Sequence, residues 1–517
     1  MASPQASDVV LRNIVERNAI RTPDRICLTV EHEDIQWTTT DVRNEGYRTA
    51  QRLRAMGVGF GDHVMIMLEN GSDWIRAYLG VCFLGAVVVP VNVSFRGQLL
   101  EYLVADTAPV KIVTSKNLRA RFDSVQGIAD LLIDPAELHG GSATAPELER
   151  PIHPCDLTAI NYTSGTTGPS KGVLTTYTQL FVTGSPWDQR LDVGEVYLSV
   201  MPMFHISGTV PLTAVWALEG HFVMCRYFEA TRFLELARET GATMSFLVGA
   251  MAGYLASLPR SPSDADNPIR RMIVVPMPAD LDRFMARYGL DEVAQVHAMT
   301  EMPPPISTRG RVTDPTSCGR VSDGFELRVV DEHDYPLPNG TPGELVVRAH
   351  DPWVITPGYL NKPVETALAW RNGWFHTGDA VYIDDNGEVH FVDRLKDAIR
   401  RRGENISSVE VEREIIAHPQ VAEAACIPVP GLHGEDEVMA FVVGVADAVI
   451  DLPELVNFLI PRLAHFAVPR YFEVIAELPK TQTMKVRKVD LRQRGMSAKT
   501  WDREQAGITL RRASALN

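Results

Sequence analysis

Runs of β-branched and other apolar residues alternate along most of the chain with stretches whose apolar positions recur every three or four residues. This alternation predicts helices packed on largely parallel sheets, an α/β fold. Three of the predicted strands are "TAINYT" (158–163), "RMIVVP" (271–276) and "EVAQVH" (292–297). Each runs into a loop at its carboxyl end, which is the edge where open α/β sheets bind ligands. We therefore expect these three loops to meet at one edge.

The most apolar stretch of the chain is "YLGVCFLGAVVVPVNVSF" (78–95), which Gly80, Gly85, Pro90 and Asn92 interrupt. A membrane-spanning helix needs about 20 consecutive apolar residues. The stretch predicts instead a buried helix, a turn at Gly85 and a core strand. The N-terminal "MASPQASDVVLRNIVERNAIR" has charges where an export signal has its apolar segment. The sequence thus predicts no integral membrane segment and no export signal.

From about residue 325 the pattern changes to strands joined by tight turns. "FELRVVDEHDYPLPNGTPGELVVRA" (325–349) predicts two strands, and "VYIDDNGEVHFVD" (381–393) predicts a hairpin. In that hairpin we expect Asn386 and Gly387 to supply the positive φ angles of the turn. Further on, Ser407 and Glu410 form a predicted capping box for a helix that Pro419 terminates.

The length of 517 residues indicates two or three folding units. We place a domain boundary near Lys396, before a basic, glycine-containing segment. The predicted N-terminal domain, 1–395, has helices on mixed, largely parallel sheets plus a β-rich subdomain. The predicted C-terminal domain, 396–517, is small, mobile and α+β.

Composition and charge narrow the functional classes. Hydrophobic residues make up 45% and charged residues 22% of the chain, as in globular proteins. The net charge of -15 argues against a nucleic-acid partner, because binding to phosphate backbones needs clustered cations. The six cysteines form no CxxC pair, so neither a zinc site nor a disulfide framework is indicated, and a reducing cytoplasm fits.

The segment "NYTSGTTGPSKGVLTT" (161–176) is the strongest chemical signal. A strand followed by glycines exposes backbone N–H groups that can converge on an anion, and the hydroxyl groups and a lysine add further donors. The spacing does not match the Walker pattern, so a P-loop nucleotide triphosphatase is disfavoured. Read alone, such a run of small residues is also common in surface turns.

The segment resembles the phosphate loop of the acyl-adenylate-forming superfamily, which includes acyl-CoA ligases, adenylation domains of peptide synthetases and luciferases. Further family segments recur in order over nearly the whole chain: "MPMFH" (201–205), "MTE" (299–301), "GELVVRA" (343–349), "GWFHTGD" (373–379), "VDRLKDAIRRRGENIS" (392–407) and "LPKTQTMKVRK" (478–488). Within the superfamily the chain looks most like bacterial carnitine- and crotonobetaine-type acyl-CoA ligases. The resemblance implies that a carboxylate attacks the α-phosphate of ATP, and that the thiol of coenzyme A then displaces AMP.

The resemblance also assigns the residues of the first step. The phosphate-binding residues are Thr163, Ser164, Gly165, Thr166, Thr167, Gly168 and Lys171. Glu301 and Thr166 are assigned to Mg²⁺, for which hard oxygen ligands are suited, and Thr300 lies beside Glu301 for the α-phosphate. Asp379 would bind the ribose with Arg394 beside it, and His297 stands where the family stacks a tyrosine on adenine. Lys485 matches the adenylation lysine, a compact charge on a flexible stem.

For the second step the resemblance implies that the small domain rotates about Lys396. A hinge of this kind absorbs a large change in φ and ψ. Gly403 would then meet the pantetheine arm of coenzyme A, and the arginines at 400–402 could meet its phosphates. His205 matches a residue thought to gate thiol entry, although a lone histidine is as often a satisfied core residue.

The chain departs from the family pattern in three places. His297-Ala298 replaces Tyr-Gly, which predicts weaker ATP affinity at low pH, because an imidazole titrates near neutral pH. "VVPMPADL" (274–281), with Pro276 and Pro278, replaces a Gly-Ala-Pro segment of the adenine loop. Met484 replaces the glycine before the catalytic lysine, and glycine is the residue that adopts positive φ without strain.

Two alternatives to a ligase that uses ATP, Mg²⁺ and free coenzyme A stay open. The protein could load the acyl group onto a carrier protein, or it could be a catalytically impaired nucleotide- or acyl-binding homologue. The predicted acyl pocket, including "SFLVGAMAGYL" (245–255), is mainly apolar and small. This favours an apolar monocarboxylic acid, cyclic or branched, with a betaine acid such as carnitine as the runner-up. The resemblance also allows a homodimer.

Overall fold

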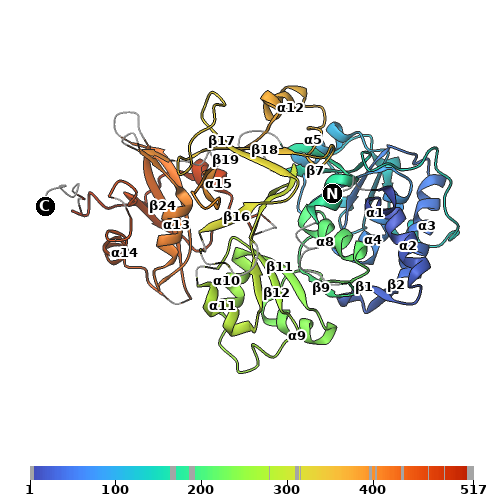
Figure 1. Cartoon of the computed structure of the whole chain (residues 1–517), viewed down its shortest axis with the longest axis horizontal. Helices are drawn as coiled ribbons and strands as arrows, with labels where there is room; N and C mark the ends of the chain where they lie inside the picture. Colours follow the sequence, from blue (N-terminus) through green and yellow to red (C-terminus); the bar gives the residue numbers. More distant parts are fainter. Residues whose placement is uncertain are drawn as a thin grey trace. The chain divides into compact units, whose positions relative to one another are not determined.

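The computed structural model describes residues 5–163, 170–184, 193–278, 280–308, 312, 314, 316–394, 399–401, 404–431, 436–446, 448–463, 465–481, 484–508 and 510. Its contacts divide the chain into two units (Figure 1). Unit 1 comprises Met1–Leu327 and Val347–Phe375, and unit 2 comprises Arg328–Val346 and His376–Asn517. The domain boundary near Lys396 stays a prediction, because residues 395–398 lie outside the described residues.

Two mainly parallel sheets form the framework of unit 1. The first has the order β6-β5-β3-β4-β7-β8, in which only the β7–β8 pair is antiparallel. Its strands are β3 (His63–Met67), β4 (Val87–Pro90), β5 (Lys111–Thr114), β6 (Leu132–Ile133), β7 (Leu157–Thr163) and β8 (Lys171–Thr176). The predicted strand at 158–163 is therefore confirmed as β7, and the predicted phosphate loop connects β7 to β8.

The second sheet has the order β13-β12-β11-β9-β10-β1-β2, in which only the β1–β2 pair is antiparallel. Its strands are β1 (Ile26–Val30), β2 (Ile35–Thr38), β9 (Val196–Ser199), β10 (His221–Met224), β11 (Met244–Val248), β12 (Arg271–Val275) and β13 (Glu292–Ala294). The carboxyl ends of β12 and β13 share one edge as expected. The third predicted loop follows β7 in the other sheet, so the expectation that all three loops meet at one sheet edge was wrong.

The strand predicted over 292–297 is also divided. Gln295 separates β13 from β14 (Val296–Met299), which pairs with β15 (Met302–Ser307) instead of with β12. Gln295 is held by Thr308 through two hydrogen bonds: the Thr308 N–H donates to the Gln295 carbonyl at 3.0 Å, and the Gln295 N–H donates to the side-chain Oγ1 of Thr308 at 2.9 Å. An apolar run contains no signal for such a change of sheet.

The described part of unit 1 also contains α-helices. They are α1 (Ala6–Val9), α2 (Leu11–Arg21), α3 (Thr39–Ala55), α4 (Ser72–Phe83), α5 (Gln98–Thr107), α6 (Tyr177–Thr183), α8 (Ile206–Ala217), α9 (Ala230–Thr240), α10 (Gly249–Ser257), α11 (Leu281–Tyr288) and α12 (Pro363–Ala369). In Figure 1, α9, α10 and α11 gather around β11 and β12. None of the described helices combines the length and the apolar composition that a membrane crossing requires.

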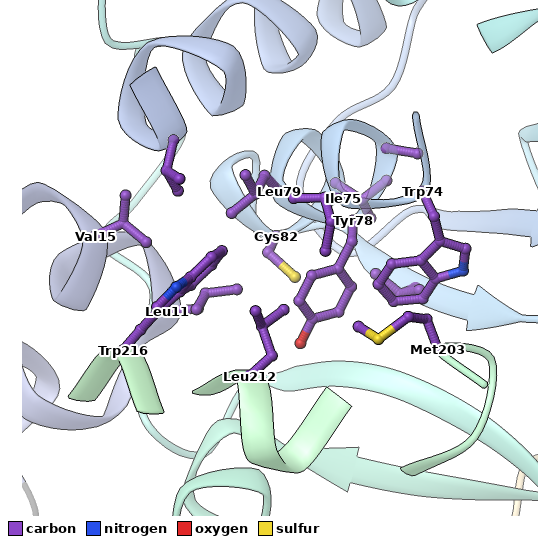
Figure 2. Close-up of a cluster of buried hydrophobic side chains, with 14 of the residues drawn as sticks. Leu11, Val15, Trp74, Ile75, Tyr78, Leu79, Cys82, Met203, Leu212 and Trp216 are labelled. Carbon is purple, nitrogen blue, oxygen red and sulfur yellow. The ribbon is translucent and has the colours of Figure 1, made fainter. Parts of the chain in front are cut away.

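Helix α4 lies at the centre of the largest hydrophobic core, with ten of its twelve residues buried. Figure 2 shows its side chains beside those of α2 and α8, with Met203 near Trp74 and Tyr78. Trp74 and Tyr78 stack with ring centroids 5.0 Å apart. Next comes a turn in which Gly85 has φ 69°, and then β4. The prediction for 78–95 of a buried helix, a turn at Gly85 and a core strand is confirmed, because close packing and not membrane insertion explains its apolar character.

Strands and short helices make up unit 2. Strands that lie wholly or partly in unit 2 have the order β20-β19-β18-β17, with β17 (Phe325–Val330), β18 (Gly343–Ala349), β19 (Phe375–Ile383) and β20 (Val389–Arg394). A second sheet has the order β23-β24-β25-β26, with β23 (Val421–Pro430), β24 (Asp436–Gly444), β25 (Tyr471–Val474) and β26 (Trp501–Asp502). The remaining elements are β21 (Ile399–Arg401), β22 (Glu404–Ile406), α13 (Ser408–Ile416), α14 (Leu452–Leu459) and α15 (Lys488–Arg494). The predicted fold class, α/β with an α+β C-terminal part, is confirmed.

One local prediction in unit 2 needs correction. In the turn of the β19–β20 hairpin, residues 384–388, only Gly387 has positive φ, at 80°. The Gly387 N–H donates to the Asp384 carbonyl at 3.0 Å, so Asn386 is an inner residue of a turn that does not require positive φ there. At the start of α13 the Ser407 hydroxyl donates to the Val392 carbonyl, and Asp393 Oδ2 accepts the Ser408 N–H at 2.7 Å. A carboxylate from β20 therefore contributes to the cap of this helix, and the capping box of Ser407 with Glu410 stays a prediction, because the Glu410 side chain lies outside the described residues.

Candidate active site

The phosphate loop begins and ends on paired strands. Thr163, the last residue of β7, lies opposite Lys171, the first residue of β8. Pairing of this kind holds the two ends of the loop together. The predicted phosphate-binding residues Ser164, Gly165, Thr166, Thr167 and Gly168 lie outside the described residues.

Thr300 and Glu301 form the turn between β14 and β15, in which Met299 pairs with Met302. Two other segments hold this turn: Gln179 Nε2 on α6 donates to the Thr300 carbonyl at 2.8 Å, and the Thr356 N–H donates to the Glu301 carbonyl at 2.7 Å. Glu301 is only 7% exposed. Its position is thus set by tertiary contacts, which a lone Thr-Glu pair in the sequence could not indicate.

Tyr359 connects this turn to the phosphate loop. Its hydroxyl donates to Glu301 Oε1 at 3.0 Å, and Lys171 Nζ lies 4.8 Å from the centre of its ring. Burial, and secondly the charge of Glu301, raise the pKa of Tyr359 well above its ordinary value, so the phenol remains protonated and acts as the donor. Two residues assigned to the nucleotide, Lys171 and Glu301, are therefore brought together through a third that sequence reasoning missed.

The two histidines that the resemblance assigns to the site, His205 and His297, have different surroundings. His205 precedes α8, and its Nδ1 accepts the Ser207 N–H at 3.1 Å and contacts Ser207 Oγ at 2.7 Å, so it acts as the N-cap of that helix. His297 lies on β14 opposite Ile306 and is half-buried. In the adjoining adenine loop, the Met277 N–H donates to the Gln295 side chain at 3.1 Å. The roles of both histidines stay predictions.

In unit 2, Asp379 occupies a constrained point on β19. It is 3% exposed, lies opposite Arg394 of β20, and its N–H donates to Thr377 Oγ1 at 3.1 Å. Glu344 fixes Gly378, the residue before Asp379: its Oε1 accepts the Gly378 N–H at 3.1 Å. Its Oε2 lies 3.0 Å from His376 Nδ1. The structure thus brings the two predicted ribose residues, Asp379 and Arg394, to facing positions of one hairpin.

Lys485 lies in a tight turn of unit 2 and is exposed. The Thr481 N–H donates to the Lys485 carbonyl at 2.8 Å, and the Lys485 N–H donates to Thr481 Oγ1 at 3.1 Å. Met484, just before the lysine, has φ 61°. This left-handed conformation is the one that glycine adopts without strain, and here methionine holds it. The predicted hinge Lys396 and the predicted pantetheine contact Gly403 lie outside the described residues.

Comparison with known proteins places this geometry in a family. The family model described as AMP-binding enzyme matches residues 15–360, and that of the AMP-binding enzyme C-terminal domain matches residues 410–485. The chain belongs to the AMP-binding enzyme family. It is 29% identical over 494 residues to the crotonobetaine/carnitine–CoA ligase of Proteus mirabilis, covering 88% of this chain and 93% of that protein.

Two solved structures have the same fold. The anthranilate CoA ligase AuaEII in complex with anthranoyl-AMP matches with a TM-score of 0.85 at 22% identity, covering 95% of this chain and 99% of that one. The O-succinylbenzoate coenzyme A synthetase of Bacillus subtilis, in complex with ATP and a magnesium ion, matches with a TM-score of 0.82 at 26% identity, covering 93% and 99%. The predictions of the acyl-adenylate-forming family, of its fold and of an AMP-binding enzyme are confirmed.

Proposed function

We propose that the protein is an AMP-forming carboxylic acid–CoA ligase, which forms an acyl-adenylate from the acid and ATP and then transfers the acyl group to coenzyme A. The family membership and the similarity to proteins named as CoA ligases support this reaction class. The observation that carries the proposal is the grouping of Lys171, Tyr359 and Glu301 beside the phosphate loop. A cation and a carboxylate at one place suit a nucleotide phosphate and its metal ion.

Mg²⁺ fits the donor set at this place. The Glu301 carboxylate is a hard oxygen ligand, and its Oε1 accepts a hydrogen bond from the Tyr359 hydroxyl. Glu301, together with the predicted ligand Thr166, would hold the ion. When bound, Mg²⁺ neutralises phosphate charge. In the proposed site Lys171 binds phosphate oxygens through its ammonium group, and the backbone of the turn at Thr300 orients Glu301.

The remaining predicted residues act in unit 2. Asp379 would accept hydrogen bonds from the ribose hydroxyls, since an ionised carboxylate can accept both. Lys485 would deliver its charge to the oxygens at the reacting phosphate. For the second step we keep Lys396 as the hinge, Gly403 as the pantetheine contact and His205 as the residue that gates thiol entry. Each of these roles rests on the family resemblance.

The acid is proposed to be an apolar monocarboxylic acid, cyclic or branched. The lining predicted from sequence includes α10 and the end of β11, where Val248 and Met251 are buried and apolar. A betaine acid is the second candidate, because it is the substrate class in the name of the Proteus mirabilis relative. A panel with both kinds of acid, read by CoA-dependent release of AMP and pyrophosphate, separates the two.

Loading of a carrier protein is a separate possibility for the second step. Formation of free acyl-CoA by the purified protein supports the ligase, whereas an acyl-adenylate that reacts only with a phosphopantetheinyl protein contradicts it. A cytoplasmic location completes the proposal, because all six cysteines are free thiols, as expected in a reducing compartment. A homodimer is the oligomeric state that the family resemblance suggests.

A further inference from the structure

The backbone around Tyr359 is fixed by strand β8. The Leu174 N–H donates to the Gly358 carbonyl at 3.1 Å, the Leu360 N–H donates to the Gly172 carbonyl at 2.8 Å, and Val173 pairs with Tyr359 across an antiparallel bridge. Residues 358–360 therefore pair with β8 at the edge of the first sheet of unit 1. Its attachment sets the place of the Tyr359 side chain relative to Lys171 independently of local sequence.

The Tyr359 side chain contacts two groups of opposite charge. Its ring lies within cation–π distance of the Lys171 ammonium, and its hydroxyl donates to the Glu301 carboxylate. Across the described residues, Lys171 has no carboxylate within ion-pair distance. Without the Tyr359 side chain between them, the Lys171 ammonium and the Glu301 carboxylate would attract each other. A direct ion pair would then compete with the binding of phosphate by Lys171 and of a metal ion by Glu301.

We propose that Tyr359 is a positioning residue that keeps Lys171 and Glu301 apart and oriented. In this arrangement Lys171 binds the nucleotide phosphates and Glu301 binds the metal ion. This inference rests on the proposed function. The ring acts on Lys171 and the hydroxyl acts on Glu301, so the two contributions can be removed one at a time. Partners that orient a metal ligand affect metal affinity strongly, commonly by about 10- to 100-fold.

Tyr359→Phe removes the hydroxyl and keeps the ring. We expect the Mg²⁺ concentration for half-maximal ATP binding to rise about 10-fold, with ATP affinity in the absence of Mg²⁺ unchanged. Tyr359→Leu removes the ring as well and allows Lys171 to reach Glu301. We expect this variant to bind ATP more weakly both with and without Mg²⁺. Both affinities are measured by titration calorimetry, so no turnover is needed.

Tyr102→Phe is the matched control. The Tyr102 hydroxyl donates to the Ser170 carbonyl at 3.0 Å and lies 3.4 Å from Asp106 Oδ2, and Lys362 Nζ lies 5.8 Å from its ring centre. Like Tyr359, Tyr102 has a lysine near its ring and a carboxylate near its hydroxyl, but it has no assigned role in nucleotide binding. Thermal unfolding of each variant shows whether a change in binding reflects loss of structure.

A double-mutant cycle gives the sharpest test. In the background of Glu301→Gln, Tyr359→Phe should have no further effect on Mg²⁺ dependence, because the hydroxyl then has no carboxylate to orient. A Tyr359→Phe variant with wild-type Mg²⁺ dependence overturns the inference while leaving the proposed function intact. Failure of the wild type to bind Mg-ATP overturns the proposed function itself, and the inference with it.

Discussion

Replacing Met484 by glycine tests whether the backbone before Lys485 limits the adenylation step. Met484 has φ 61°, and its N–H donates to the Thr481 carbonyl at 2.9 Å, so the left-handed conformation is part of the hydrogen-bonded turn. A side chain with a Cβ costs roughly 1–2 kcal/mol in this conformation. Glycine removes that cost but adds about 0.5–1 kcal/mol of backbone entropy. The difference between the midpoints of these two ranges is a net gain of about 0.8 kcal/mol, or about fourfold in the equilibrium constant for forming the turn.

We therefore expect Met484→Gly to form the acyl-adenylate about fourfold faster, with the CoA-dependent step unchanged, since Lys485 is assigned to the first step alone. Single-turnover release of pyrophosphate measures the first step, and release of acyl-CoA from preformed adenylate measures the second. Met484→Ala is the matched control, because it shortens the side chain but keeps the Cβ. If alanine accelerates the first step as much as glycine, side-chain bulk and not backbone strain is responsible. A glycine variant slower than the wild type would refute the reasoning.

Three further predictions concern charge and pH. Burial, and secondly Arg25, lower the pKa of His221 from 6.5 to about 4. As the pH falls from 6.5 to 4 the unfolded chain therefore binds this proton before the folded state does, and the free energy of unfolding decreases by about 3 kcal/mol. His221→Asn should remove that part of the decrease, which denaturant titrations at several pH values measure. Burial alone would lower the pKa of Lys488, but neighbouring carboxylates, Glu412 first, raise it, so its ion pair at 2.8 Å stabilises the fold up to alkaline pH. Lys488→Met should lower the free energy of unfolding by about 3 kcal/mol at neutral pH and by much less above the raised pKa of Lys488. An equal decrease at both pH values contradicts a stabilising ion pair. Asp379→Asn should raise the KM for ATP about 10-fold or more, with an unchanged melting temperature, because a charged hydrogen-bond acceptor is removed.

Elements whose signal is local could be predicted from the sequence. Helix α4, the Gly85 turn and strand β4 follow from apolar periodicity and one glycine, and β7 follows from a short apolar run. The β19–β20 hairpin was also predicted, although in its turn Gly387 has positive φ and Asn386 does not. Family motifs then gave the reaction class, because they preserve the residue types that the chemistry requires.

Features that depend on distant contacts could not be predicted. Tyr359 reaches Glu301 only because its segment pairs with β8, and nothing in "TPGYLN" indicates that partner. At the start of α13 the Ser408 N–H donates to a carboxylate of another element, Asp393 of β20. Gln295 lies between β13 and β14, which belong to different sheets, so the predicted single strand is divided there. Such choices are made by tertiary packing, which outweighs local preference.

The most direct test of the central claim is release of pyrophosphate from Mg-ATP across a panel of carboxylic acids, with and without coenzyme A, by the wild type and by Lys485→Ala. The account predicts that one class of acid gives CoA-dependent formation of AMP and acyl-CoA, and that the variant loses most of the adenylation rate while still binding ATP. If the wild type binds ATP but releases no pyrophosphate with any acid, or if Lys485→Ala is as fast as the wild type, the account is contradicted.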